Sequence, residues 1–154
     1  MTNHVLVAPE RRAFEGPSVF LAGGITNSPR WQDDVINYLT ATLDGITIFN
    51  PRRPNDFGDV TVEYERQVIW ELDHIFAADL VLFWFPAAEC RITRIEFGLV
   101  VGHNKPVVVG ADPQFVNYHY LTLLTQRYNL PLYDQFDALL AATQVWLTNK
   151  QASY

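Results

Sequence analysis

Three carboxylates are the side chains of this sequence best placed for acid–base or nucleophilic chemistry. Glu96 lies in the first turns of a helix predicted over 91–103, directly after a buried strand predicted over 80–85. Glu71 and Asp73 lie on the preceding helix, predicted over 62–77. Two carboxyls in unequal environments can divide their work, one ionised as a nucleophile and the other protonated as an acid. Such a pair would suit glycosyl transfer through a covalent intermediate.

The helix over 62–77 determines which of the two acids can face a pocket. Its apolar residues predict one buried stripe, formed by Val68, Ile69, Leu72, Ile75 and Phe76. At about 100° per residue, Glu71 and Asp73 flank Leu72 on opposite sides, so only one of them easily points into a given pocket. Both could equally be the solvated margins of an amphipathic helix. Gln67 lies one turn from Glu71 and can pair with it, and Gln67 is also a candidate residue for binding substrate. Trp70 could stack on a planar ring.

Other kinds of catalytic site find little support in the sequence. The four histidines are scattered and Cys90 is the only cysteine, so a dedicated metal site is not expected. The sequence has no Gly-x-Ser-x-Gly nucleophile elbow, no Gly-x-Gly-x-x-Gly fingerprint and no P-loop. Cys90 with the adjacent Arg91 could act as a nucleophile, but no partner base is identifiable. We therefore expect neither a metal nor another cofactor.

Strand-like and helix-like segments alternate along the chain, which predicts an α/β fold with helices on both faces of a parallel sheet. We expect a single domain over 1–154, built on one doubly wound, five-stranded parallel sheet of the flavodoxin or Rossmann type with the strand order 2-1-3-4-5. Residues 1–17 would form an N-terminal arm or an extra edge strand. The five strands are predicted over 19–22, 46–49, 80–85, 107–109 and 130–133, and the helices over 31–43, 62–77, 91–103, 115–128 and 136–147.

The loops after the first two of these strands carry residues that suit ligand binding. Ligands of open α/β sheets bind beyond the carboxyl ends of the strands. Gly23 and Gly24 follow the first strand and would let the backbone approach a ligand, although two glycines also make an ordinary tight turn. Asn50 and Pro51 follow the second strand, and the next two residues are arginines that could bind an anion or remain solvated. Residues 55–59 are predicted to continue this loop.

The composition argues against several classes of partner. Hydrophobic residues make up 49% of the chain and charged residues 18%, which is typical of a folded globular protein. The formal net charge of −6 provides no basic field for the backbone of a nucleic acid polymer. The N-terminal residues show no targeting signal, and no apolar run reaches membrane-spanning length. We expect a cytoplasmic protein with small-molecule ligands and no membrane partner.

Four segments of the chain match the pattern of a known family: Val19 to Gly24, Asn50-Pro51, Ala78 to Leu82 and Glu96-Phe97-Gly98. With these segments the chain resembles the nucleoside 2-deoxyribosyltransferase family and its nucleotide N-glycosidase relatives. The resemblance implies that Glu96 is the nucleophile, which would attack the anomeric carbon of the sugar and form a glycosyl ester. The acid that protonates the departing base would be Glu71, with Asp73 as the alternative if the helix is shifted.

The resemblance also implies which residues line the pocket. Gly23 and Gly24 would lie on the sugar side, and Trp70 or Trp84 on the base side. Phe20 departs from the family pattern, because members often carry a tyrosine there that hydrogen-bonds to the nucleophile.

The loop before the nucleophile also departs from the family pattern. It carries Arg91 and Arg94, where members often have glycine, serine or aspartate residues that contact the 5′ end of the sugar. These arginines could meet a phosphate, which would favour a nucleotide over a nucleoside, or could be surface charges.

An enzyme that transfers 2-deoxyribose between nucleobases is the function that the resemblance implies. The alternatives are a nucleoside 5′-monophosphate N-glycosidase, which would hydrolyse the bond after the same first half-reaction, and a nucleotide-binding module without turnover. Members commonly borrow residues across a subunit contact, so the resemblance also implies a homo-oligomer, a dimer or larger. The aromatic segment over 118–128 would pack in the core or contact a partner subunit.

Overall fold

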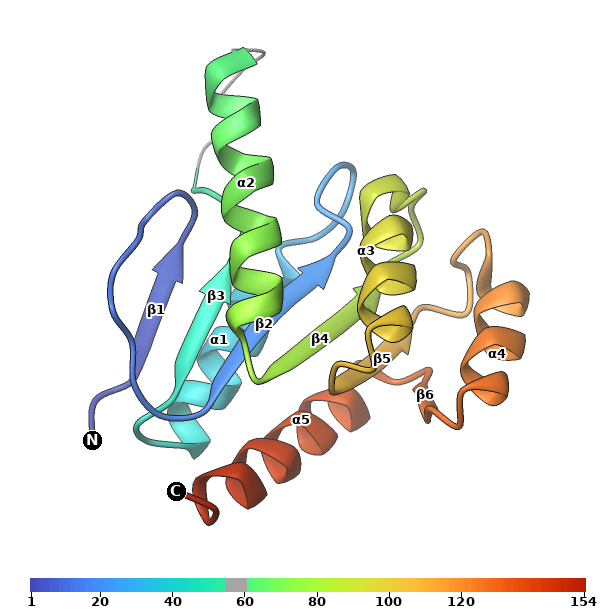
Figure 1. Ribbon diagram of the computed structural model, residues 1–154. Coiled ribbons are helices and arrows are strands. Elements are labelled where there is room, and N and C mark those ends of the chain that lie inside the picture. Colours follow the sequence, from blue (N-terminus) through green and yellow to red (C-terminus); the bar gives the residue numbers. More distant parts are fainter. Residues whose placement is uncertain (55–60) are drawn as a thin grey trace.

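The computed structural model describes residues 1–54 and 61–154, and Figure 1 shows how they are arranged around one sheet. Strands and helices alternate, as the sequence predicts. The elements are β1 (His4–Val7), β2 (Ser18–Gly23), α1 (Trp31–Thr42), β3 (Thr47–Asn50), α2 (Thr61–Ala77), β4 (Leu80–Phe85), α3 (Arg91–Gly102), β5 (Val107–Ala111), α4 (Tyr118–Arg127), β6 (Leu132–Tyr133) and α5 (Phe136–Gln151). The loop predicted over 55–59 lies outside the described residues.

The strands pair in parallel in the order β1-β3-β2-β4-β5-β6. The predicted five-stranded sheet with the order 2-1-3-4-5 is therefore wrong for the sheet as a whole. The difference comes from the N-terminal segment, because His4–Val7 pairs with Thr47–Asn50 and adds a sixth strand at the edge. The other five strands, β3-β2-β4-β5-β6, stand in the relative order 2-1-3-4-5 when β2 is counted first.

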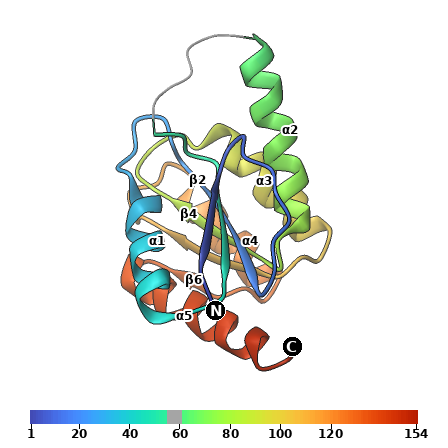
Figure 2. The ribbon, with the colours of Figure 1, turned by 90° about the vertical axis from the view of Figure 1, so that its left-hand side faces the viewer.

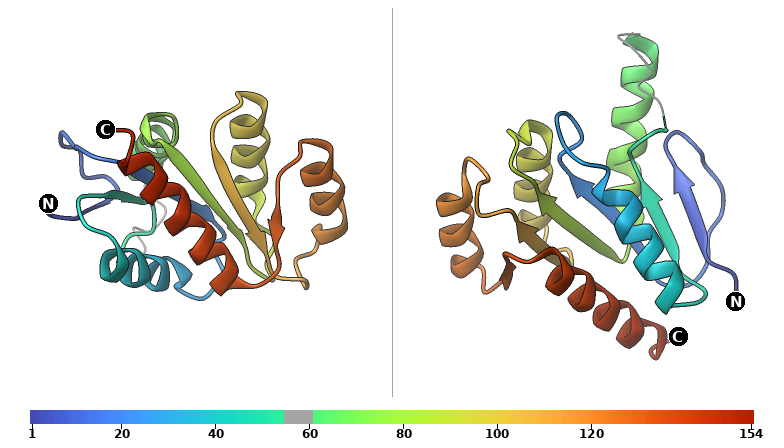
Figure 3. Two further views of the ribbon diagram at one scale, coloured as in Figure 1. Left: turned by 90° about the horizontal axis from the view of Figure 1, so that it is seen from below. Right: turned by 180° about the vertical axis from the view of Figure 1, so that it is seen from behind.

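Helices cover both faces of the sheet. α2, α3 and α4 lie on one face, whereas α1 and α5 lie on the other (Figures 1 and 3). The edge-on view of Figure 2 separates α1 and α5 from α2 and α3. β4 is buried on both faces because its side chains alternate between the two cores: Val81, Phe83 and Phe85 pack toward the first layer, and Leu80, Leu82 and Trp84 toward the second. This explains its unbroken apolar sequence.

A polar cluster joins β2 to β4 at the amino ends of these strands. Oδ2 of Asp79 accepts hydrogen bonds from the backbone N–H of Ser18 at 2.9 Å and from Ser18 Oγ at 2.8 Å. Ser18 Oγ in turn accepts a hydrogen bond from the backbone N–H of Asp79 at 3.0 Å. Nζ of Lys150, on α5, lies 3.5 Å from Oδ1 of Asp79. Asp79 therefore joins β2, β4 and α5 at the amino ends of the strands, on the side of the sheet opposite to their carboxyl ends.

α2 is rotated about its axis relative to the predicted stripe. Ile75 is buried as predicted, but Ile69, Leu72 and Phe76 are exposed. The largest side chain of the helix, Trp70, is fully buried instead, and its indole Nε1 donates a hydrogen bond to the carbonyl of Glu10 at 2.7 Å. An indole removes far more apolar surface from water than an isoleucine or a leucine, so its burial decides which face of the helix turns inward.

The segment between β1 and β2 packs over α2 and β3. Phe14 makes an edge contact with Phe49 at a centroid distance of 4.9 Å. Nη2 of Arg11 donates a hydrogen bond to Oδ2 of Asp73 at 2.8 Å. Together with the contact between Trp70 and Glu10, these interactions hold the arm against α2 and β3. No helix in the described ranges is long and apolar enough to cross a membrane.

Candidate active site

Glu96 on α3 and Glu71 on α2 form an interacting pair of carboxyls. Glu96 is only 9% exposed. Its burial, and secondarily the charge of Glu71, raise the pKa of Glu96 from the ordinary 4.5 to about 8. Without a ligand, Glu96 therefore holds a proton at neutral pH. Strongly shifted carboxyls of this kind are typical of functional sites.

The local sequence forces Glu96 into the interior. α3 begins at Arg91, directly after Cys90, whose backbone is left-handed with a φ of 50°. The buried residues of α3 are spaced as one inward face, namely Thr93, Glu96, Phe97, Val100 and Val101. The carboxyl of Glu96 thus occupies a position that an apolar side chain would normally fill. Such a position is costly for a charge unless the group is protonated or paired.

Glu71 lies on the inward face of α2 and is half-buried. Burial raises its pKa, whereas a hydrogen bond from Gln67 and the charge of Arg53 lower it, with a net increase. Nε2 of Gln67 donates this hydrogen bond to Oε1 of Glu71 at 2.8 Å. The two carboxyls of the pair therefore differ in their surroundings: Glu71 has a donor and a neighbouring positive charge, and neither contributes to the pKa shift of Glu96.

Asp73, the alternative acid, lies apart from this pair. The rotation of α2 exposes its carboxylate, which is 53% accessible and pairs with Arg11 of the N-terminal arm. Residues 71 and 73 are about 200° apart around a helix, so when one faces the core the other faces solvent. The structure thus brings Glu71, and not Asp73, together with Glu96.

Gly23 is the last residue of β2, and Gly24 follows it beside Cys90, the residue before α3. A Cβ on Gly24 would lie 2.7 Å from Cγ of Pro86 and 2.9 Å from both Cys90 Sγ and Ser28 Oγ. A Cβ on Gly23 would lie 2.3 Å from the carbonyl oxygen of Trp84. Both glycines are therefore required by close packing at the carboxyl edge of the sheet, where the sequence predicts a ligand.

The loop after β3 reaches the same edge. Asn50 is buried, and its Oδ1 accepts a hydrogen bond from the backbone N–H of Arg52 at 3.0 Å. The guanidinium of Arg52 donates to the carbonyls of Ile25, Ser28 and Pro29, and so ties this loop to the loop after β2. Nε of Arg53 donates to Oε1 of Gln67 at 2.8 Å. Both arginines thus connect parts of the protein to one another.

The two tryptophans predicted to face the base lie inside the protein. Trp70 is fully buried, stacks on His74 at a centroid distance of 4.3 Å and packs against Phe20. Trp84 packs on the other face of the sheet, where its ring contacts Phe136 of α5 at 5.0 Å. The structure therefore does not bring either ring together with the two carboxyls.

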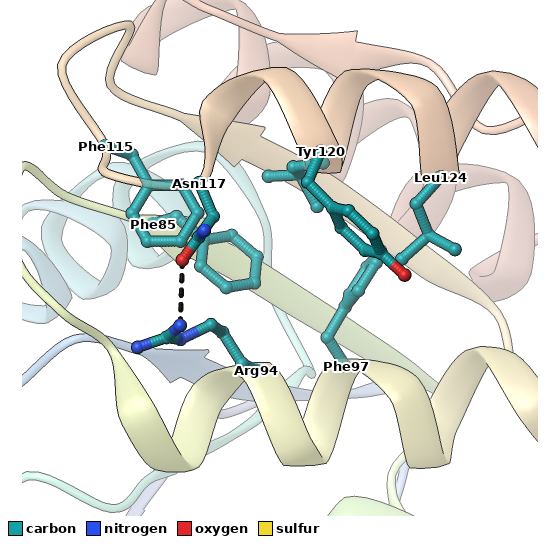
Figure 4. A pocket seen from close by; sticks show the side chains of 8 residues that line it. Phe85, Arg94, Phe97, Phe115, Asn117, Tyr120 and Leu124 are labelled. Carbon is teal, nitrogen blue, oxygen red and sulfur yellow. Dashed lines mark hydrogen bonds between the residues drawn. The ribbon is translucent and has the colours of Figure 1, made fainter.

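Arg91 and Arg94 bind residues outside the carboxyl pair. Nε of Arg91 binds the carboxylate of the exposed Glu89. Nη1 of Arg94 donates a hydrogen bond to Oδ1 of Asn117 at 2.8 Å. Figure 4 shows this contact at a pocket between α3 and α4. The pocket has a volume of about 290 Å³ and is lined by Phe85, Arg94, Phe97, Phe115, Asn117, Tyr120, Leu121 and Leu124, without either carboxyl of the pair.

Sequence reasoning missed the part that Arg53 plays. The spacing of Gln67 and Glu71 predicted their pairing, and the structure contains that hydrogen bond. The contact between Arg53 and Oε1 of Gln67 could have been suspected, because Arg53 is the second residue after the Asn50-Pro51 motif and lies at the same end of the sheet. Within the described ranges, no group of three or more His, Cys, Asp or Glu side chains could hold a metal ion.

Comparison with models of protein families gives a match over much of the chain. The family model described as nucleoside 2-deoxyribosyltransferase like matches residues 16–115, about two-thirds of the chain. This span includes β2, β3, the described part of α2, β4 and α3, and with them both carboxyls of the pair. No match was found among curated protein sequences. The extent of the family match shows that the chain belongs to the nucleoside 2-deoxyribosyltransferase-like family.

Proposed function

We propose that this protein cleaves the N-glycosidic bond of 2′-deoxynucleosides and transfers the 2-deoxyribosyl group to a second nucleobase. The observation that supports this most strongly is the buried, asymmetric pair of Glu96 and Glu71 at the carboxyl edge of the sheet. Family membership provides the reaction class. The pair provides two carboxyls of the kind that retaining glycosyl transfer requires.

The first half-reaction makes a covalent intermediate. An oxygen of ionised Glu96 attacks C1′ of the deoxyribose while the bond between C1′ and the base nitrogen breaks. The electron pair of that bond stays on the base, and Glu71 donates a proton to the base as it leaves. The products are a glycosyl ester of Glu96, a neutral base and ionised Glu71. Gly23, Gly24 and Asn50 surround the edge at which the sugar would bind.

The second half-reaction reverses the first with a different base. Ionised Glu71 removes a proton from the incoming base, whose nitrogen attacks C1′ and releases Glu96 as a carboxylate. Water in place of the base would give free deoxyribose, and the enzyme would then be a hydrolase.

Before the first attack, Glu96 has to lose its proton and Glu71 has to hold one. In the ligand-free protein, Glu96 holds a proton, because burial raises the pKa of Glu96 to about 8. The reactive form requires the proton on Glu71 and the charge on Glu96. Because the charge of Glu71 acts on Glu96, the two carboxyls titrate as a coupled pair, and ionisation of one favours the protonated form of the other. A sugar whose C1′ develops positive charge would favour the ionised form of Glu96.

Mass spectrometry of the intact protein tests this proposal directly. The protein is incubated with a 2′-fluorinated deoxynucleoside, which slows breakdown of the ester, and digestion locates the adduct. We expect the adduct on Glu96, and release of the base when the four natural 2′-deoxynucleosides and their 5′-monophosphates are supplied as a panel. A new nucleoside formed from an added base identifies a transferase, whereas free sugar identifies a hydrolase. No adduct and no released base with any substrate would leave a binding module as the better description.

We also propose that the outer surface of the layer formed by α2, α3 and α4 binds a second copy of the chain. Val62, Ile69, Leu72 and Phe76 form a second, exposed apolar row on α2, opposite to its buried face. Their spacing of seven, three and four residues is that of a seam between paired helices. Ile92 and Ile95 of α3 and Tyr120 and Leu123 of α4 are exposed on the same layer. A two-fold axis would place the α2 row against its own copy.

A further inference from the structure

Gln67 holds Glu71 by only one of its two carboxylate oxygens. Its Nε2 donates a hydrogen bond to Oε1 of Glu71 at 2.8 Å, one helical turn away. Gln67 itself is buried, with 6% of its surface exposed. Its side chain therefore has few alternative positions, and the hydrogen bond restricts the carboxyl group of Glu71 as well.

The orientation of the Gln67 amide is fixed by partners that cannot exchange roles. Oε1 of Gln67 accepts a hydrogen bond from Nε of Arg53 at 2.8 Å, and arginine has no acceptor atom. Nε2 of Gln67 also donates to the carbonyl of Pro51 at 2.8 Å, and a carbonyl has no donor. Turning the amide over would break both contacts. Gln67 can therefore present only an N–H group to Glu71.

The donors of Gln67 are also fully used. A primary amide has two N–H hydrogens, and here one points to Pro51 and the other to Glu71. No hydrogen remains for a substrate. The predicted role of Gln67 in binding substrate therefore finds less support in this geometry than a role that acts through Glu71.

We infer that Gln67 is a positioning residue for proton transfer: by occupying Oε1 of Glu71, it leaves Oε2 as the oxygen that carries the proton to and from the base. This inference rests on the proposed function, in which Glu71 protonates the leaving base. The hydrogen bond from Gln67 to Oε1 thereby determines which oxygen of Glu71 is protonated. The proton is on Oε2, and Oε1 remains the acceptor for Gln67. The Glu71 carboxyl is thereby kept from rotating between two equivalent arrangements.

The groups that interact with Glu71 belong to three elements. The charged groups are Glu96 of α3 and Arg53 of the loop after β3, and the neutral amide of Gln67, on α2 itself, acts through its hydrogen bond. Arg53 is also bound to Glu63 of α2, whose Oε2 lies 3.0 Å from its Nη1. Burial raises the pKa of Glu71, and the hydrogen bond from Gln67 is the larger of the two effects that lower it. Removing the donor should therefore raise the pKa of Glu71.

Carbon-13 NMR of protein labelled at the glutamate carboxyl carbons measures this without substrate. The signals of Glu71 and Glu96 are assigned with Glu71→Gln and Glu96→Gln and then followed against pH. In Gln67→Met, which keeps the length of the side chain but removes both hydrogen-bonding groups, we expect Glu71 to titrate roughly one pH unit higher. Gln67→Glu, which retains an acceptor for Arg53, should raise the titration of Glu71 at least as far. It covers the case in which Gln67→Met does not fold.

The pH dependence of deoxynucleoside cleavage gives the second readout. The alkaline limb of kcat, where Glu71 loses the proton that it must donate, should move upward with the titration of Glu71. kcat should fall about tenfold or more because the carboxyl is no longer held in position, while KM changes little. Gln144→Met is the matched control. Gln144 is partly buried and accepts a hydrogen bond from Tyr38 at 2.7 Å, but it lies on the opposite face of the sheet. It should lose some stability without moving either titration.

Two results would overturn the inference. The first is a Gln67→Met protein in which Glu71 titrates as in the wild type. The second is a variant whose KM rises while kcat and the pH profile stay unchanged, because this would make Gln67 a substrate ligand. A wild-type protein that cleaves no deoxynucleoside of the panel would instead refute the proposed function. The NMR titration is independent of turnover, so it still reports whether Gln67 controls Glu71.

Discussion

Glu96 lies close enough to Glu71 for the charge of Glu71 to contribute to raising the pKa of Glu96 to about 8, with burial as the larger cause. Among the described residues, Glu71 has a compensating donor in Gln67 and a compensating cation in Arg53, and neither of them acts on the pKa of Glu96. A buried carboxyl without such partners lowers the stability of a fold. Glu96 on the inward face of α3 therefore lowers the stability of the fold, which is expected where a residue serves reactivity instead of stability.

Replacing Glu96 by glutamine should make the protein more stable, and increasingly so as the pH rises. The folded protein keeps a proton on Glu96 up to about pH 8, whereas the unfolded chain loses it near the ordinary value of 4.5. The contribution of Glu96 to stability is therefore fully present below about pH 4.5 and is lost as the pH rises through about 8. At about pH 9, Glu96→Gln should raise the free energy of unfolding by roughly 2–5 kcal/mol.

Urea unfolding followed between about pH 5 and pH 9 checks this prediction. The same variant should form no covalent adduct with the fluorinated nucleoside. Equal stabilities of wild type and Glu96→Gln across the whole pH range would mean that Glu96 titrates normally, and the buried pair could not have the proton arrangement proposed above.

Glu71→Gln should lose base protonation, whereas Asp73→Asn should not. General acid catalysis contributes about 10²- to 10⁴-fold, so Glu71→Gln should slow cleavage of ordinary deoxynucleosides by that amount. Asp73 serves as the matched control, because it lies two residues away on the same helix but pairs with Arg11 in solvent. Kinetics with 7-methyl-2′-deoxyguanosine distinguish the roles, since its base leaves without being protonated. Glu71→Gln should cleave this substrate at nearly the wild-type rate.

The opposite pattern would be informative too. If Asp73→Asn lost activity and Glu71→Gln kept it, α2 would have to turn by about half a rotation in the working enzyme. That rotation would expose the indole of Trp70, which is now fully buried and bonded to the carbonyl of Glu10.

The sequence predicted the alternation of elements and the bounds of β4 because these depend on local patterns. An unbroken apolar run such as Leu80–Phe85 has one good solution, a central parallel strand. β1 was harder to predict, because pairing at a sheet edge depends on a partner strand some forty residues away. Whether His4–Val7 forms a strand or an arm is decided by that pairing and not by its own composition.

The candidate site was predictable to the extent that it depends on spacing. Glu96 lies in the second turn of α3, which follows β4 after one short loop, so its place at the carboxyl ends of the strands could be inferred. The choice between Glu71 and Asp73 could not, because α2 has two apolar rows and only tertiary packing of Trp70 selects one. The prediction that Trp84 faces the base overlooked the alternation of side chains along a strand. This alternation turns Trp84 toward α5.

Ser18→Ala should destabilise the fold without affecting the site. The hydroxyl of Ser18 is fully buried, donates to Asp79 Oδ2 and accepts from the backbone N–H of Asp79. Its removal leaves that N–H without its partner, at a cost of about 1–3 kcal/mol in the free energy of unfolding. Ser18 opens β2 at the edge opposite to Glu96, so kcat and KM should stay within experimental error. Urea unfolding and steady-state kinetics check the two parts separately.

Ser153→Ala is the control for this variant, because its hydroxyl is exposed and bonds only to the carbonyl of Lys150 one turn earlier. It should change stability by less than about 0.5 kcal/mol. A Ser18→Ala protein of wild-type stability would show that Asp79 does not depend on this contact to join β2 to β4.

Leu72→Lys should separate the proposed dimer into monomers. Leu72 lies in the middle of the exposed apolar row of α2, between Ile69 and Phe76, and a buried ammonium at that position would have no acidic partner in the row. The dissociation constant measured by sedimentation velocity should rise at least about tenfold. The fold should survive, because the side chain of Leu72 is 42% exposed in the single chain.

Val145→Lys makes the same kind of change on α5, in the layer on the other face of the sheet, and should leave the association unchanged. A wild-type chain that stays monomeric at high concentration, or a Val145→Lys chain that dissociates as readily as Leu72→Lys, would show that the α2 row does not pair with its own copy.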